Sequence, residues 1–136
     1  GLSAASNAKR VIGIEIVPSA VEDAKNNAVR NGITNAGFIC GDAGTCTSQL
    51  LQRNIQPEVA IVDPPRKGLD RLTIDSLVKM NPERIVYVSC DPATLARDCA
   101  LLNEQGYGVQ VVQPVDMFPQ TTHVETVVLM SKLKTK

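Results

Sequence analysis

The stretch RIVYVSCDPATLARD (residues 84–98) decides the fold class, because it joins a strand pattern directly to a helix pattern. The apolar run 84–89 predicts a buried strand. Asp91 is a favourable helix cap, and Pro92 suits the first helical position because its missing N–H is not needed there. The thiol of Cys90 is therefore expected where a strand passes into a helix.

The same alternation of strand and helix patterns extends to both sides of this stretch. Short apolar runs predict strands, and helical periodicity between them predicts helices. The predicted strands are residues 11–16, 37–40, 58–62, 84–89, 108–113 and 124–130, and the predicted helices are 19–31, 45–54, 70–79 and 92–106. This order predicts an α/β fold, a doubly wound Rossmann-like sheet that is mostly parallel.

The two ends of the chain depart from simple alternation. The loop-like segment 114–123 leaves no room for a helix between the last two strands, which predicts an antiparallel C-terminal strand. Residues 1–8 have the character of a helix already under way, and the strand at 11–16 resembles the second strand of a nucleotide-binding unit. Ser19 and Glu22 have the spacing of a capping box at the first full helix.

Composition limits the classes of function. The chain has 136 residues, of which 43% are hydrophobic and 21% charged, which suits one domain with a single core. Fourteen basic and fourteen acidic residues give a formal charge of zero, which excludes a uniformly basic surface for nucleic acid. The few aromatic residues offer little material for stacking bases. A basic cluster occurs only at the C-terminus, at Lys132, Lys134 and Lys136.

The cysteines do not indicate a metal site or a disulfide scaffold. Cys40, Cys46, Cys90 and Cys99 form no C-x-x-C pair, and the chain has one histidine. We expect no metal, and we interpret Cys40, Cys46 and Cys99 as core or neutral positions. The sequence has no apolar run of membrane-spanning length and no signal-peptide pattern, so a cytoplasmic protein without a membrane partner is expected.

Polar clusters follow the predicted strands at positions where α/β folds bind ligands. Ligands bind outside the carboxyl ends of parallel strands, where Asp63 and Cys90 are expected. Glu15 lies near the end of the first predicted strand, a position from which an acid accepts hydrogen bonds from a ribose diol. A cysteine at a strand end can be a reactive thiol or simply a small buried hydrophobe.

Three motifs resemble the RNA (uracil-5-)-methyltransferase family, which uses S-adenosylmethionine. They are DPPRKG at residues 63–68, VSCDPATLARD at 88–98 and DMFPQTTHVE at 116–125, in the family's order along the chain. The resemblance implies that residues 1–136 are the C-terminal portion of the catalytic domain. The first strand and its glycine-rich cofactor loop would precede Gly1, so this segment alone is expected to be inactive.

The resemblance also implies roles for individual residues. Cys90 would be the nucleophile and Glu125 the general base, while Glu15, Asp42 and Asp63 would line the cofactor or active-site pocket. The substrate would be a uridine in structured ribosomal or transfer RNA, with no DNA partner.

Each catalytic role has a chemical reason. Uracil C5 is a poor nucleophile, and addition of a thiolate to C6 makes C5 electron-rich enough to accept a methyl group. A base must then remove the C5 proton before the thiol can leave. The target base must also leave its stack to enter the pocket.

Several alternatives stay open at this stage. Glu125 could be a solvated strand carboxylate, Asp42 a turn residue, and Arg66 with Lys67 either a phosphate contact or a solvated turn. We interpret His123 as structural rather than catalytic. Competing functions are a cytosine-5 RNA methyltransferase, an exocyclic amino-group methyltransferase that uses the Asp-Pro-Pro turn, and a remnant that binds without catalysis.

Overall fold

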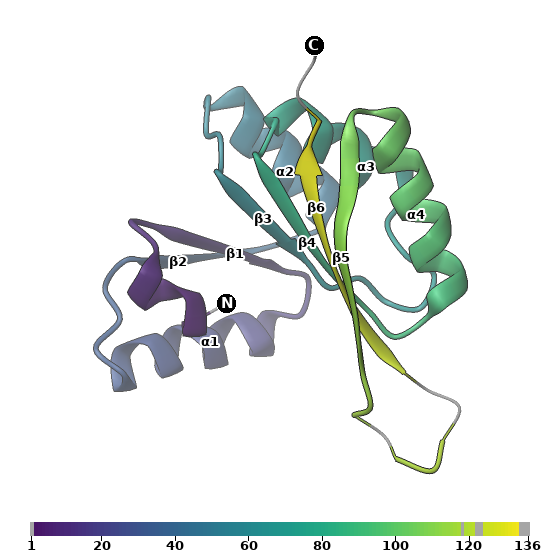
Figure 1. Ribbon diagram of the computed structural model, residues 1–136. Coiled ribbons are helices and arrows are strands. Elements are labelled where there is room, and N and C mark those ends of the chain that lie inside the picture. The colour runs from purple at the N-terminus through teal and green to yellow at the C-terminus, as the bar shows by residue number, and fades with distance from the viewer. Residues whose placement is uncertain (1, 118, 122–123, 134–136) are drawn as a thin grey trace. The chain divides into compact units, whose positions relative to one another are not determined.

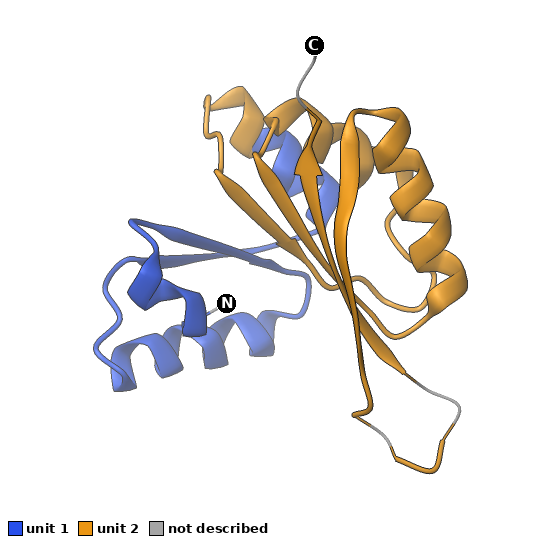
Figure 2. Ribbon diagram, in the orientation of Figure 1, with its two compact units in different colours: residues 1–49 blue, residues 50–136 orange. Residues whose placement is uncertain are grey.

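The computed structural model describes residues 2–117, 119–121 and 124–133. The chain divides between Gln49 and Leu50 into two compact units (Figures 1 and 2). The division falls inside helix α2 (Ala43–Gln52). Each unit has its own group of strands.

The first unit is built around two parallel strands. After a 3₁₀ helix, η1 (Leu2–Asn7), come β1 (Val11–Glu15), α1 (Pro18–Arg30) and β2 (Ala36–Cys40). β1 and β2 pair from Val11 opposite Ala36 to Glu15 opposite Cys40, and α1 is the crossover between them. The predicted strands and helix are confirmed, and the helix-like start of the chain is a short 3₁₀ helix.

The predicted capping box at the start of α1 is wrong. The helix begins one residue before Ser19, at Pro18, with Val17 as its N-cap and no side chain bonded to the free amides. Proline at the first helical position fixes a helical φ, and this moves the helix start ahead of Ser19. The amide of Val17 instead donates to Glu15 Oε1 at 2.9 Å.

The second unit contains a four-stranded sheet. Its elements are β3 (Val59–Val62), α3 (Arg71–Met80), β4 (Arg84–Ser89), α4 (Pro92–Glu104), β5 (Tyr107–Val115) and β6 (Glu125–Lys132). The strand order is β3-β4-β6-β5, in which β6 runs antiparallel to both of its neighbours (Figure 1). Because β3 and β4 are parallel, only β6 is reversed, as the sequence predicted. β5 continues two residues beyond its predicted end.

The core of the second unit forms on one face of its sheet. Alternate residues of β4, Ile85 and Tyr87, are fully buried, as expected for a strand with one face covered. They cluster with apolar side chains from α3, α4, β5 and β6, namely Ile74, Leu77, Leu95, Leu102, Tyr107, Val128 and Met130. No helix in the described part of the chain has both the length and the apolar character to span a membrane.

Replacement of Leu102 by alanine tests this core. Leu102 lies on α4 and has no exposed surface. Leu102→Ala should lower the free energy of unfolding by about 2–5 kcal/mol, because it removes buried methyl groups and leaves a cavity. Leu72→Ala, at an exposed position of α3, is the control and should change it by no more than about 0.5 kcal/mol. Equal losses in urea unfolding would show that α4 does not pack as described.

Candidate active site

Three of the candidate site residues lie at one end of the four-stranded sheet. Asp63 directly follows β3, Cys90 directly follows β4, and Glu125 is the first residue of β6. β3 and β4 are parallel and β6 runs in the opposite direction. The carboxyl ends of β3 and β4 and the amino end of β6 therefore lie at the same end of the sheet (Figure 1). The sheet topology therefore brings together residues that are up to 62 positions apart in sequence.

The register of β4 and β6 relates the position of Cys90 to that of Glu125. The last residue pair between β4 and β6 is Ser89 opposite Thr126. One further step in this register would set Cys90 opposite Glu125. Opposite residues on antiparallel strands project to the same face, with Cβ atoms about 4.5–5.5 Å apart where pairing continues. The thiol and the carboxyl group are both half-buried.

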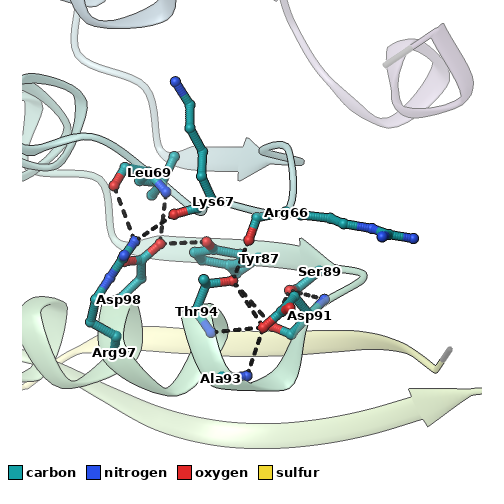
Figure 3. A network of polar contacts seen from close by, with 10 residues as sticks. All are labelled: Arg66, Lys67, Leu69, Tyr87, Ser89, Asp91, Ala93, Thr94, Arg97 and Asp98. Carbon is teal, nitrogen blue, oxygen red and sulfur yellow. Dashed lines mark hydrogen bonds and ion pairs between the residues drawn. The ribbon is translucent and has the colours of Figure 1, made fainter. Parts of the chain in front are cut away.

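A tight turn holds Cys90 at the entrance to α4. Ser89 Oγ accepts from the amide of Asp91 at 3.1 Å and donates to its carbonyl at 2.9 Å. Asp91 Oδ1 accepts from the amides of Ala93 at 2.9 Å and Thr94 at 3.0 Å, which confirms the predicted cap (Figure 3). Asp91 thus accepts hydrogen bonds from the first free amides of α4. The Cys90 thiol lies next to a helix start that is already capped.

The Asp91 carboxylate is stabilised by these contacts. The hydrogen bond from the Thr94 amide, then that from the Ala93 amide, the Thr94 hydroxyl and the nearby Arg66 charge all lower the pKa of Asp91 below its usual value. A carboxylate at the first turn of a helix also meets the positive end of the helix dipole. Asp91 is therefore charged whenever the protein is near neutral pH.

Three side chains of α4 form hydrogen bonds with the backbone of the turn after Asp63. We call this set of contacts, made by Thr94, Arg97 and Asp98, the turn clamp. Thr94 Oγ1 donates to the Arg66 carbonyl at 2.9 Å, and Arg97 Nη2 donates to the Lys67 carbonyl at 2.9 Å. Asp98 Oδ2 accepts from the Leu69 amide at 2.7 Å and from the hydroxyl of Tyr87 at 2.6 Å. Figure 3 shows the side chains of Arg66 and Lys67 extending away from this network.

The sequence alone does not reveal the turn clamp. Asp98 was visible only as the last residue of a motif, and Tyr87 as one residue of an apolar strand. A signal was nevertheless present, since Asp98 lies three positions after Leu95 and four before Leu102, on the face of the helix that packs inward. An acidic residue on a buried helical face requires partners.

Glu15 and Asp42 belong to the first unit, where Glu15 is the last residue of β1 and Asp42 lies two residues after the end of β2. The Glu15 carbonyl accepts from the Gly41 amide at 2.9 Å, and the exposed Glu15 carboxylate accepts from Val17 as described above. Asp42 Oδ1 accepts from the Thr45 amide at 2.9 Å at the start of α2, which is the turn role left open by the sequence. A cofactor role for either acid stays a prediction.

Other candidates have simpler positions. His123 and Phe118 lie outside the described residues. Cys46 is buried and Cys99 half-buried, while Cys40 is exposed. Burial, with a contribution from the adjacent Asp98 charge, raises the pKa of the Cys99 thiol, which keeps it protonated.

Comparison with known structures places the fold among the α/β methyltransferases. The crystal structure of Pyrococcus abyssi tRNA (uracil-54, C5)-methyltransferase in complex with S-adenosyl-L-homocysteine aligns with a TM-score of 0.77 and 31% identity, over 96% of this chain and 31% of that one. An rRNA methylase from Streptococcus thermophilus shares the fold, with a TM-score of 0.70 and 14% identity over 98% of this chain and 79% of that one.

Sequence comparison gives the family. Residues 1–133 match the family described as tRNA (Uracil-5-)-methyltransferase, and the chain belongs to it. A protein of Enterococcus faecalis described as an uncharacterized RNA methyltransferase is 55% identical over 132 residues, which are 97% of this chain and 29% of that protein. A Bacillus cereus protein of the same description is 53% identical over 96% of this chain and 28% of its own length. The chain thus spans less than a third of the relatives it matches.

The Asp91 cap has a pH signature. Because the folded-state pKa of Asp91 is lowered, its stabilising contribution is complete above the unfolded pKa of about 4 and is lost as the pH falls through the lower folded pKa. Asp91→Ala should therefore lower the melting temperature at pH 7, and the gap from the unsubstituted protein should shrink in strongly acidic buffer. Thermal melts between pH 7 and pH 3 measure this. A gap that stays constant across the series would contradict the assignment.

Gly68 tests the fit between the turn and α4. Its φ is +77°, and a Cβ there would strike the Asp98 carboxylate and the Arg97 guanidinium. Gly68→Ala should destabilise the protein by more than the roughly 1–3 kcal/mol of backbone strain alone. The control is Gly106→Ala, which has φ of +93° and open space around its Cβ. Equal losses in chemical unfolding would mean that the turn does not rest against these side chains.

Proposed function

We propose that the full-length protein carrying this chain methylates C5 of a uridine in structured RNA, transfer or ribosomal, through a covalent adduct on Cys90. The observation that carries the proposal is the β4–β6 register, whose last pair is Ser89 opposite Thr126; continued by one residue, it would set Cys90, after the end of β4, opposite Glu125, at the start of β6. A nucleophile and a base on one face are what substitution at C5 of a pyrimidine requires. Membership of the uracil-5 family supports uridine as the target.

The reaction follows from the chemistry of the two side chains. The Cys90 thiolate adds to C6, the C5–C6 double bond opens, and C5 becomes an enolate carbon. After C5 receives the methyl group, Glu125 removes the remaining C5 proton, the double bond re-forms and the thiolate leaves. The protein thus returns to its starting state apart from the proton on Glu125, which passes to solvent.

S-adenosylmethionine is the methyl donor in this proposal, and its sulfonium supplies an activated methyl group. The related Pyrococcus enzyme was crystallised with S-adenosyl-L-homocysteine, the demethylated product of that donor. The residues of this chain fit such a ligand, because Glu15 presents an exposed carboxylate at the carboxyl end of a parallel strand. Glu15 would accept from the ribose hydroxyls, and Asp42 and Asp63 are the other residues that we propose for cofactor binding.

RNA containing 5-fluorouridine tests the adduct directly. Fluorine at C5 cannot leave as a proton does, so the reaction should stop with the protein bonded to the RNA. We expect a covalent complex by denaturing gel electrophoresis with the full-length protein and S-adenosylmethionine, and none with Cys90→Ala. Full methylation activity in Cys90→Ala would overturn the proposal and favour an amino-group methyltransferase. Trapping by 5-fluorocytidine RNA in place of the uridine form would favour a cytosine-5 enzyme.

Glu125→Gln separates the base from the nucleophile. Without a base, adduct formation and methyl transfer should proceed on ordinary uridine RNA, but turnover should fall by about 10²–10⁴-fold and the methylated adduct should accumulate. Mass spectrometry of the covalent complex would detect the added methyl group. Normal turnover would show that Glu125 is only a solvated strand residue.

A further inference from the structure

We propose that Asp98 is a positioning residue for this reaction, which holds the turn after Asp63 rigidly against the helix that begins beside Cys90. The role is indirect, since Asp98 acts through the backbone of residues 66–69 and contacts no reacting atom. The inference rests on the proposed function, because it assumes that Asp63 and Cys90 serve one site.

Asp98 is a fully buried carboxylate with both oxygens occupied. Oδ2 accepts from the Leu69 amide and the Tyr87 hydroxyl, Oδ1 accepts from Arg97 Nε at 2.8 Å, and Oδ1 also forms an ion pair with Arg97 Nη2 at 2.7 Å. A buried carboxylate is costly unless such partners surround it. Burial and the adjacent Asp98 charge raise the pKa of Tyr87, so its hydroxyl stays protonated as a donor.

The turn clamp bonds backbone groups of three residues of the turn, Arg66, Lys67 and Leu69. Thr94 holds the Arg66 carbonyl, Arg97 holds the carbonyls of Lys67 and Leu69, at 2.9 and 3.4 Å, and Asp98 holds the Leu69 amide. The turn is also closed internally by a bond from the Gly68 amide to the Pro65 carbonyl at 2.8 Å. Two consecutive prolines directly after Asp63 restrict the remaining freedom of the backbone.

Stability alone does not account for an acid at position 98. Leu95 and Leu102 on the same face of α4 are buried apolar residues, and an apolar residue between them would pack there without desolvating a charge. An apolar residue could not accept from Leu69 or orient Arg97 toward the turn. The clamped turn follows β3, and α4 follows Cys90, so the contacts tie together the two strand ends that carry the candidate site.

Two buried tyrosines provide a matched pair of variants in the full-length protein. Tyr87 donates to Asp98. Tyr107 donates at 2.9 Å to the carbonyl of Pro82, which precedes the start of β4 and so lies at the other end of that strand from Cys90. Tyr87→Phe and Tyr107→Phe remove the same atom from equally buried rings. The measured quantities are the melting temperature, the single-turnover rate of adduct formation on 5-fluorouridine RNA, and hydrogen exchange at the Leu69 amide.

We expect Tyr87→Phe to slow adduct formation by about 10- to 100-fold, since small displacements of reacting groups have effects of this size. Exchange at Leu69 should become faster. Tyr107→Phe should lower the melting temperature comparably and leave both the trapping rate and Leu69 exchange near those of the unsubstituted protein.

A graded pair at position 98 gives a second measure. In Asp98→Asn the amide oxygen can still accept from Leu69 and Tyr87 while the contact with Arg97 is lost, so the rate should lie between those of the unsubstituted protein and Asp98→Ala. If Tyr87→Phe does not fold, Thr94→Val removes only polar contacts of a half-buried hydroxyl and should also slow trapping.

Trapping rates that follow melting temperature alone, with Tyr87→Phe equal to Tyr107→Phe, would overturn the positioning role. An unsubstituted protein that forms no adduct would overturn the proposed function and this role with it. Hydrogen exchange at the Leu69 amide distinguishes a failure of the proposed function from a failure of the turn clamp. Faster exchange at Leu69 in Asp98→Ala would show that the turn clamp exists even if the protein does not catalyse that reaction.

Discussion

The antiparallel pairing of β6 with β4 is the interaction on which the proposed site depends. β6 is inserted between β4 and β5, and its register with β4 ends at Ser89 opposite Thr126, the neighbours of Cys90 and Glu125. A shift of one residue would turn Glu125 to the opposite face of the sheet. Buried Val128 and Met130 hold that register, because a slip would expose them. Core packing and the geometry of the site are therefore fixed together.

The surroundings of Cys90 show how helix capping and reactivity are combined. Asp91 occupies the free amides of α4, so the positive end of the helix is already matched by a carboxylate. What the structure offers the thiol is a position just after the end of β4, at the end of the sheet where β6 begins with Glu125. In the proposed mechanism the fixed position of the thiol orients it toward the bound substrate, and orientation contributes much of the rate.

Local patterns predicted most of the helices and strands. They failed at the cap of α1 and at the end of β5. The strand at 84–89 and the cap by Asp91 were found because propensity, patterning and proline placement agree there. The capping box at Ser19 failed because Pro18 supplies an equally good helix start one residue earlier. The length of β5 was underestimated because an edge strand with many exposed residues lacks the alternation that marks a half-buried one.

The sequence by itself determined the fold class, the reversed last strand and the strand-end positions of Asp63, Cys90 and Glu125, because these depend on local periodicity and on connection length. Only the tertiary structure decided that all three lie at the same end of one sheet and what holds them there. Strand order and register arise from long-range packing, which one-dimensional patterns do not encode. The same holds for Asp98, whose partners come from β4 and from a turn 29 residues away, so its role emerges only when the chain is folded.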